Sequence, residues 1–174
     1  MIFVSLGTHE RPFLRLVKEI DRLSREGIIK EKIAVQLGFT DYKFKSKKIE
    51  SEKYMSQKKF DRAFRDADVI ITHGGSGNIL DAVSQGKPVV AVPRLSKFGE
   101  HVNDHQLQIV KEMEKLGNVF AVYDIEKLFE AIKKAKAAGA KKVKRKMPEI
   151  FGVIEKALGK WDEEKGARTR ARKN

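Results

Sequence analysis

The chain has no cysteine, only four prolines and a single tryptophan among its 174 residues. Without cysteine it can form no disulfide, no thiolate metal site and no cysteine nucleophile. No apolar run approaches the roughly 20 residues that a membrane-spanning helix needs. The opening residues 1–7 are too few, and lack the basic flank, for a signal peptide. These absences favour a cytoplasmic protein with one folded domain.

Positive charge is what the chain has in excess, +13 in total. Residues 133–174 contain 15 Lys or Arg and 5 Asp or Glu, so they carry +10 of it. We therefore expect a folded body at 1–132 and a basic, helical and partly disordered extension at 133–174. Such an extension can attract polynucleotide or an anionic lipid surface, or can simply be a solvated helix with a frayed end. No aromatic-interleaved RNA-binding surface accompanies it, so we expect no nucleic acid.

Apolar runs alternate with amphipathic segments along the body. Strands are expected at residues 2–6, 33–38, 69–71, 89–92 and 119–123, with a short edge strand near 42–44. Helices are expected at 13–23, 60–67, 77–86, 101–116 and 125–132, the last capped by Asp124. This alternation predicts an α/β fold, a Rossmann-like open parallel sheet with helices on both faces. Ligands of such sheets bind outside the carboxyl ends of the strands, where the loops 7–10, 73–78 and 94–106 would meet.

The most informative stretch is residues 72–81, a glycine-rich turn between an expected strand and an expected helix. Its glycines allow close backbone approach, Ser76 suits an N-cap, and the helix N-terminus offers N–H groups to an anion. Asp81, one turn along the helix, could accept from ribose hydroxyls. The turn fits neither the Rossmann dinucleotide fingerprint nor the Walker loop, and 75–77 is not the G-x-S-x-G of a hydrolase. A purely structural turn is the alternative.

A second polar cluster occupies residues 100–106, directly before an apolar-faced helix. His101 and His105 have the i, i+4 spacing of metal ligands, but no third ligand is evident, and we expect no metal. A polar helix start capped by Asn103 or Asp104 is the plain interpretation. The favoured one is hydrogen bonding to a sugar or diphosphate. His73 alone is more typical of a structural histidine at a strand end.

Taken together, these motifs carry a resemblance. The run 71–77, Gly86-Lys87-Pro88, Val92-Pro93 and the polar group 103–106, in this order and spacing, resemble the C-terminal half of family 28 glycosyltransferases. The opening 3–8 is similar to the start of that half when it forms a separate chain. Such chains include subunits of the two-subunit N-acetylglucosaminyltransferase of dolichol-linked oligosaccharide synthesis and PssE-like exopolysaccharide subunits. The resemblance covers about residues 1–132 and implies the donor-binding half of a GT-B architecture.

The resemblance also implies roles for individual residues. The glycine-rich turn and the following helix would hold the nucleotide diphosphate, and Asp81 would contact the ribose. His105 and Gln106 would face the donor sugar, and the first loop would line the interdomain cleft. His73 and His105 are the implied catalytic residues. The implied donor-binding residues are Gly7, Thr8, Gly75, Ser76, Gly77, Asn78, Asp81, Asn103 and Gln106. No cofactor is implied, since a UDP-sugar is the donor substrate.

By the same resemblance, the chain would be the catalytic, donor-binding subunit of a heteromeric UDP-sugar glycosyltransferase. It would transfer a hexose or N-acetylhexosamine to a lipid-linked acceptor. A membrane-anchored partner would supply the acceptor domain and hold the chain at the membrane, with the basic extension against anionic lipid. The alternatives are a non-catalytic enhancer subunit of such an enzyme and a nucleic-acid-binding module that uses the extension. The sequence does not name the sugar.

Overall fold

A computed structural model describes residues 1–139 and Gly152. The part of the expected extension at 140–151 and 153–174 lies outside the described residues. The described chain forms a parallel sheet of six strands in the order β3-β2-β1-β4-β5-β6. The strands are β1 (Ile2–Ser5), β2 (Ile33–Gln36), β3 (Ile49–Glu52), β4 (Val69–His73), β5 (Val89–Val92) and β6 (Phe120–Ala121). This order confirms the predicted Rossmann-like fold, with its reversal between β1 and β4.

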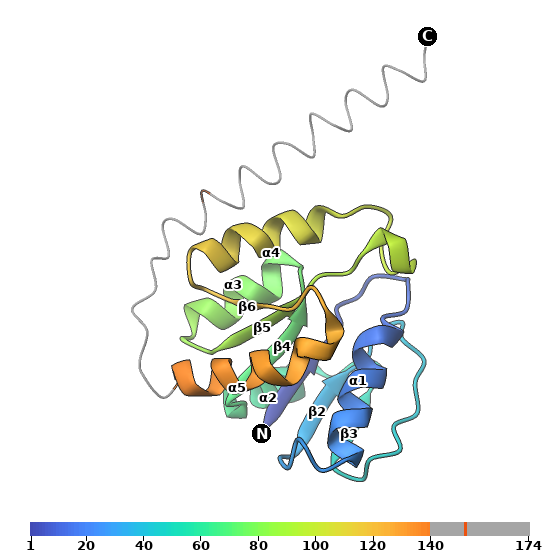
Figure 1. Cartoon of the computed structure of the whole chain (residues 1–174). Helices are drawn as coiled ribbons and strands as arrows, with labels where there is room; N and C mark the ends of the chain where they lie inside the picture. Colours follow the sequence, from blue (N-terminus) through green and yellow to red (C-terminus); the bar gives the residue numbers. More distant parts are fainter. Residues whose placement is uncertain (140–151, 153–174) are drawn as a thin grey trace.

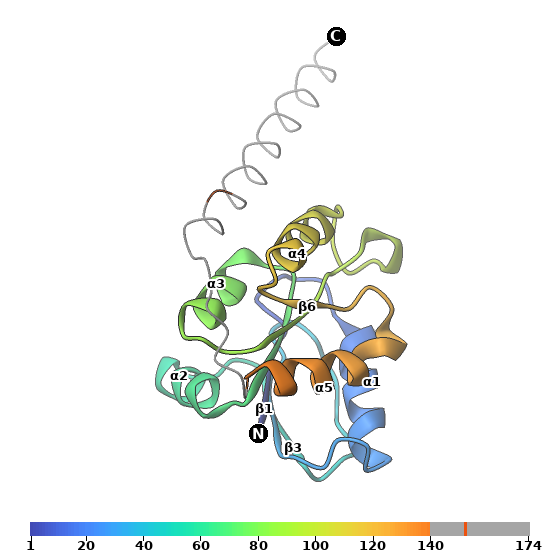
Figure 2. The same cartoon turned by 60° about the vertical axis from the view of Figure 1, so that its left-hand side comes forward.

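Helices cover both faces of the sheet (Figures 1 and 2). They are α1 (Leu14–Arg25), α2 (Gln57–Asp66), α3 (Ser76–Ser84), α4 (His105–Lys115) and α5 (Leu128–Gly139), with two short 3-10 turns, η1 (Ser96–Phe98) and η2 (Ile125–Lys127). Successive strand residues point to opposite faces. Ile2 and Val4 therefore pack with α1 and α5, whereas Phe3 packs with α2, α3 and α4.

The central strands are apolar on both faces. All residues of β1 and β5 are buried, and β4 is buried except at His73. The edge strand differs: β3 reads Ile-Glu-Ser-Glu and is largely exposed. The edge strand expected near 42–44 was therefore misplaced. That segment is a loop held by buried Asp21, which accepts hydrogen bonds from the Tyr42 hydroxyl (3.1 Å) and the Ser46 N–H (3.0 Å).

Two expected helix starts were wrong. Ser76 is the first residue of α3, and Gly75 occupies the N-cap position. The helix expected from residue 101 begins at His105. Side chains hold the preceding residues out of the helix: Asn103 Oδ1 accepts from the His105 N–H (3.2 Å) and Asp104 Oδ1 from the Ser96 N–H (2.8 Å). Local side-chain bonds of this kind compete with helix formation.

The last described helix extends beyond the expected end of the body. α5 continues across residue 132 to Gly139, and Ala135 is fully buried in the core on that face of the sheet. Asp124 Oδ1 accepts from the Glu126 N–H (3.2 Å), so Asp124 caps η2, which leads into α5. The division of the chain into a body and a basic extension at residue 132 stays a prediction.

Candidate functional site

A pocket of about 520 Å³ opens at the carboxyl edge of the sheet. It lies where β1 and β4 end and their following connections diverge, which is where open α/β sheets bind ligands. Seven of the predicted site residues line it: Gly7, Thr8, His73, Gly75, Gly77, Asn78 and Asp81. The structure thus brings the first two predicted loops into one site. Among the described residues, no Lys or Arg lines this pocket, so an anion bound by this part of the chain would depend on backbone N–H groups.

His73, the last residue of β4, lies between two glycines. A Cβ atom at Gly7 or at Gly75 would come within 2.0 Å of its ring. The Gly75 N–H donates to His73 Nδ1 (2.6 Å). Burial, followed by the nearby Arg94 charge, lowers the pKa of His73 to about 3. The imidazole is therefore neutral near pH 7, and because Nδ1 accepts, its proton is on Nε2. In this state His73 can donate to an oxygen, but it is a poor base.

The turn after His73 directs the N-terminus of α3 at the pocket. Asn78 ties this helix to the sheet, because its amide donates to Ser5 Oγ (2.9 Å) and Thr72 Oγ1 (3.3 Å). Asn78 also lines the pocket. The first-turn N–H groups of α3 have no partner within the helix, and the helix dipole adds partial positive charge there. The end of α3 can therefore bind an anion.

Two pocket residues on α3 are open to solvent. Gly77 is exposed, and a Cβ atom added to it would meet nothing within 4 Å. Asp81 is exposed and lies one turn further along the helix. Its carboxylate lines the same pocket as Gly75 and Asn78. A ligand whose anionic group meets the helix end could thus present hydroxyl groups to Asp81; the contact of Asp81 with a ribose stays a prediction.

The loop after β1 approaches the pocket closely because two glycines adopt positive φ. Gly7 has φ of 73° and Gly38 has φ of 59°. A Cβ atom at Gly38 would lie 2.1 Å from the Gly7 carbonyl oxygen. Only glycine at these positions allows the loops after β1 and β2 to touch. Thr8, next along the chain, is exposed at the pocket.

The third predicted group does not line the pocket. Asn103, His105 and Gln106 lie at the start of α4, and the structure places none of them among the lining residues. Gln106 is buried, and its Oε1 accepts from the Gly74 N–H (3.0 Å) and the Arg94 N–H (3.1 Å). Its side chain therefore joins the residues that follow β4 and β5.

A buried cluster of charged residues, called the clasp below, joins the loops after β1 and β5. It consists of Arg15, Arg94 and Glu100. Arg15 pairs with Glu100 through two hydrogen bonds of 3.0 and 2.9 Å. Arg94, 1% exposed, donates to the carbonyl oxygens of Leu6 (2.7 Å) and Arg11 (2.7 Å). Among the described residues, the buried side-chain atoms without a hydrogen bond are Arg15 Nη1 and Arg94 Nε. Both guanidinium groups lie over the Phe13 ring, which provides a cation–π contact instead.

Histidines gather at this clasp. The rings of His9 and His101 are 4.4 Å apart, and His73 is close enough to both for their charges to affect its protonation. Burial lowers the pKa of His9 and of His101, and Arg94 lowers both further. The described residues contain no group of three His, Asp or Glu side chains placed to hold a metal ion. They also include no helix long and apolar enough to cross a bilayer.

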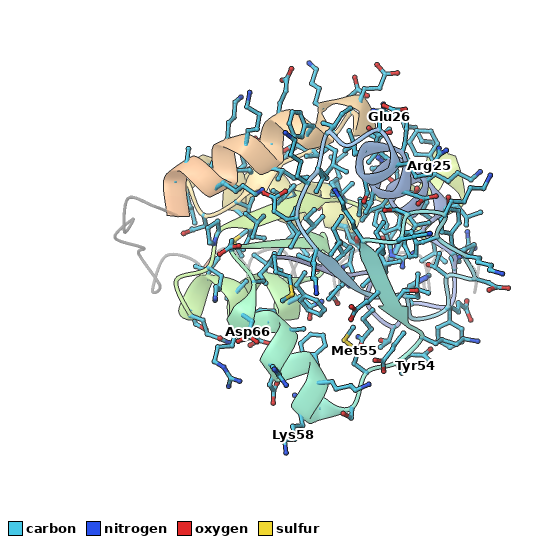
Figure 3. All side chains as sticks on the ribbon, turned by 90° about the horizontal axis from the view of Figure 1, so that it is seen from below. Arg25, Glu26, Tyr54, Met55, Lys58 and Asp66 are labelled. Carbon is cyan, nitrogen blue, oxygen red and sulfur yellow. The ribbon has the colours of Figure 1, made fainter. Side chains whose placement is uncertain are left out.

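The remaining wall of the pocket was missed from the sequence. It consists of Ser5, Gln36, Tyr54, Met55, Gln57 and Phe60. Figure 3 shows Tyr54 and Met55 in the connection between β3 and α2. Within this wall, Tyr54, Met55 and Phe60 offer apolar surface against which a flat ring could lie. Ser56 caps α2 by accepting from the Lys59 N–H (3.4 Å), and this cap signal could have located the connection.

A Rossmann-type sheet with a glycine-lined pocket at its reversal is an arrangement typical of nucleotide-binding α/β domains. The sequence comparison is more specific: the family model of the glycosyltransferase family 28 C-terminal domain matches residues 1–157. The chain belongs to this family, as the resemblance predicted.

Curated relatives include UDP-N-acetylglucosamine transferase subunits. The human subunit ALG13 is 26% identical over 124 residues, which are 68% of this chain and 11% of that protein. The ALG13 of Eremothecium gossypii is 33% identical over 67 residues, 38% of this chain and 31% of that protein. The chain therefore spans only a minor part of the length of these relatives.

Solved structures confirm the fold class. The glycotransferase of kitacinnamycin superposes with a TM-score of 0.64 at 19% identity, covering 90% of this chain and 39% of that one. MurG of Acinetobacter baumannii superposes with a TM-score of 0.56 at 17% identity, covering 89% of this chain and 49% of that one. The solution structure of ALG13 superposes with a TM-score of 0.55 at 21% identity, covering 86% of this chain and 92% of that one. At these identities the likeness shows the fold, that of one half of a GT-B glycosyltransferase.

Proposed function

We propose that this chain is the donor-binding, catalytic subunit of a UDP-sugar glycosyltransferase. The observation that carries the proposal is that the N-terminus of α3, His73 and Asp81 share one pocket at the sheet reversal. Membership of the family and the relatives described as UDP-N-acetylglucosamine transferase subunits support the same donor. The transferred sugar would be a hexose or an N-acetylhexosamine.

The geometry suggests how each residue would act on the donor. The diphosphate would accept from the first-turn N–H groups of α3, with Gly77 leaving room for its approach. Asp81 would accept from the ribose hydroxyls, and the base would lie against the Met55 and Phe60 wall. As the sugar leaves, charge grows on the diphosphate. The helix end and the neutral His73 would stabilise this charge by hydrogen bonds already in place.

A partner subunit completes the proposal. The relatives described as transferase subunits support a second chain that supplies the acceptor-binding half. We propose a membrane-anchored partner and a lipid-linked acceptor. The excess of basic residues at 133–174 would hold the pair against an anionic bilayer, so the chain would be peripherally membrane-associated.

Calorimetric titration of the purified chain with UDP, with GDP and dTDP as controls, tests the donor site. We expect saturable binding that prefers UDP and that falls at least tenfold in Asp81→Ala, because the ribose loses its acceptor. Glu112→Ala, an exposed change on α4 away from the pocket, is the matched control and should bind like the wild type. The proposed site would be contradicted if the wild type bound UDP, GDP and dTDP equally well and Asp81→Ala bound each of them as tightly as the wild type.

The second candidate is the non-catalytic enhancer subunit. The relatives described as transferase subunits favour a division of labour between two chains. Transfer activity of the reconstituted pair separates the two roles. A catalytic donor subunit should lose most activity on Asp81→Ala, whereas an enhancer should tolerate the change.

A further inference from the structure

The connection between β2 and β3 presents a row of lysines to solvent. Residues 43–48, called the lysine loop below, read Lys-Phe-Lys-Ser-Lys-Lys and contain no acid. All four lysines are exposed, at positions 43, 45, 47 and 48. Within the described part of the chain, none of their ammonium groups has an ion pair or a hydrogen bond, whereas Lys59 pairs with Glu52. The charge of the lysine loop is therefore available to an anion from outside the described chain.

Side chains that point inward fix the shape of the lysine loop. The buried carboxylate of Asp21, on α1, accepts from the Tyr42 hydroxyl at 3.1 Å. It also accepts from the N–H groups of Lys45 (3.1 Å) and Ser46 (3.0 Å). Tyr42 and Phe44 pack against the core, with ring centroids 5.0 Å apart. The loop thus runs alongside α1 with its aromatic rings inward and its lysines outward (Figure 1).

The acidic residues of the adjacent strand lie on the other face of the sheet. In β3, Ile49 packs with the same core cluster as the aromatic rings of the lysine loop. Because side chains alternate along a strand, Glu50 and Glu52 point to the opposite face, where Glu52 pairs with a lysine of α2. At the end of α1, Arg25 and Asp21 lie 3.7 Å apart and add no net charge beside the loop. The strand therefore leaves the lysines unneutralised.

From this arrangement we infer that the lysine loop binds the surface of an anionic lipid bilayer. A bilayer presents many negative head groups in one plane, and exposed lysines on one side of a domain bind it without any shaped pocket. Each lysine near such a surface strengthens binding roughly fivefold. A nucleic acid fits the loop less well. Its aromatic rings pack on the core and offer no stacking platform, and lysine lacks the planar fork with which arginine binds phosphate.

This contact orients the candidate site. The lysine loop lies beside the outermost strand, β3, whereas the pocket opens at the carboxyl edge of the sheet. With the bilayer against the loop, the mouth of the pocket faces along the membrane and stays free for a partner subunit. The inference goes beyond the proposed function, because it depends on no ligand of the pocket. It adds a membrane contact within the folded body to the attraction expected from the basic extension.

Two variants of the full chain with equal net charge test the inference. The loop variant carries Lys43→Gln, Lys45→Gln and Lys47→Gln, and the control variant carries Lys58→Gln, Lys111→Gln and Lys127→Gln, all at exposed positions. Glutamine keeps the backbone N–H that Asp21 binds, so the loop variant should fold. In about 0.1 M salt we expect it to bind phosphatidylserine vesicles at least tenfold more weakly than the wild type. The control variant should stay within threefold, and both should bind UDP like the wild type.

The absence of native cysteine permits a second readout, which reports where the lipid touches the chain. Lys47→Cys and the control Lys111→Cys are each labelled with a nitroxide. Accessibility of the label to a water-soluble nickel chelate is then measured with and without saturating vesicles. We expect the label at residue 47 to become at least fivefold less accessible on binding, and the label at residue 111 to stay unchanged. This comparison holds even though the extension also attracts the vesicles.

Four results would overturn the inference. Equal losses in the loop and control variants would assign the attraction to net charge. Unchanged accessibility at residue 47 in the bound chain would assign it to the extension. Competition by soluble glycerophosphoserine would show a site for one head group and not for a surface. Tighter binding of polyuridylate than of vesicles, lost in the loop variant, would assign the loop to nucleic acid. A chain that fails to bind UDP would refute the proposed function and leave these vesicle results decisive.

Discussion

His73 shows how one buried side chain can link the site to acid stability. Its pKa of about 3 in the folded chain compares with an ordinary value of 6.5. Between those values the unfolded chain binds a proton that the folded chain does not. The free energy of unfolding should therefore fall by about 1.4 kcal/mol per pH unit as the pH drops below about 6.

A substitution that cannot titrate tests this effect. In His73→Asn the amide oxygen can still accept from the Gly75 N–H, but the side chain binds no proton. The slope of the free energy of unfolding against pH should therefore decrease by the contribution of about one proton. Urea unfolding at pH 5, 6, 7 and 8 measures the slope. Comparison at pH 8, where His73 is neutral in both states, isolates any change in packing. An identical slope in both proteins would show that His73 is not the group responsible.

A substitution at Gly77 should change folding stability and nucleotide affinity in opposite directions. Nothing lies within 4 Å of an added Cβ, and the residue is helical, so Gly77→Ala should raise the free energy of unfolding by about 0.5 kcal/mol. The methyl group would, however, stand in the pocket, and UDP affinity should fall several-fold. Gly75→Ala is the contrasting variant: its Cβ would meet the His73 ring at 2.0 Å, so stability and binding should both fall. Thermal unfolding and calorimetry report the two quantities.

Among the secondary-structure elements, the Arg15–Glu100 pair is the strongest link between the start of α1 and the loop after β5. The two side chains are 13% and 4% exposed. Removing one member of a buried pair leaves an uncompensated charge and typically costs about 3–5 kcal/mol. We expect Glu100→Ala to lose that much stability in urea unfolding.

The exposed pair between Glu112 and Lys115 provides the control for this prediction. Glu112→Ala should cost less than about 1 kcal/mol, since surface pairs are worth little. The double variant Arg15→Met with Glu100→Met should recover much of the loss, because neither charge stays buried alone. If Glu100→Ala were as stable as Glu112→Ala, the clasp would contribute nothing to holding the two loops.

The elements also show what the sequence could and could not predict. Central strands and amphipathic helices follow from apolar periodicity, and the glycine-rich turn from local chemistry, so their positions were close to correct. The start of α4 was missed because Asp104 bonds the distant Ser96 N–H, eight residues away. The position of β3 was missed because an exposed edge strand has little apolar pattern.

The residues of the candidate site also fall into some that the sequence predicted and others that it missed. His73 to Asp81 is contiguous, so its pattern predicted a shared pocket. Tyr54 and Phe60 reach that pocket only through the sheet order, which places the end of β3 near β1 across β2. Gln106 has the residue type expected at a sugar site, yet its partners are backbone groups 12 and 32 residues away. Such long-range pairings carry no local signal.

For the whole molecule, the uneven charge is the feature with a measurable outcome. Most of the +13 lies beyond residue 132. We expect the chain to sediment with phosphatidylserine vesicles, to bind phosphatidylcholine vesicles weakly, and to be released as salt rises from 0.1 to 0.5 M.

Charge removal locates the attraction. Changing four lysines of the extension to Gln should lower the affinity for anionic vesicles at least tenfold and leave UDP binding unchanged; they are Lys141, Lys142, Lys144 and Lys146. The matched control carries four Lys→Gln changes on the body, at Lys18, Lys30, Lys58 and Lys111, which the structure leaves exposed. Equal loss in both variants would mean that general net charge, and not the extension, attracts the membrane.

The position of β1 in the sheet has a consequence for synthesis of the chain on the ribosome. β1 leaves the exit tunnel before the other described strands, yet in the finished sheet it lies between β2 and β4, and Ile2 pairs with Val69. Its fully buried residues must therefore wait for about 70 residues of further translation before their second neighbour exists. Until then the nascent chain exposes one side of a strand that is buried on both sides in the finished sheet, which makes this interval the one in which chaperones would have most to protect.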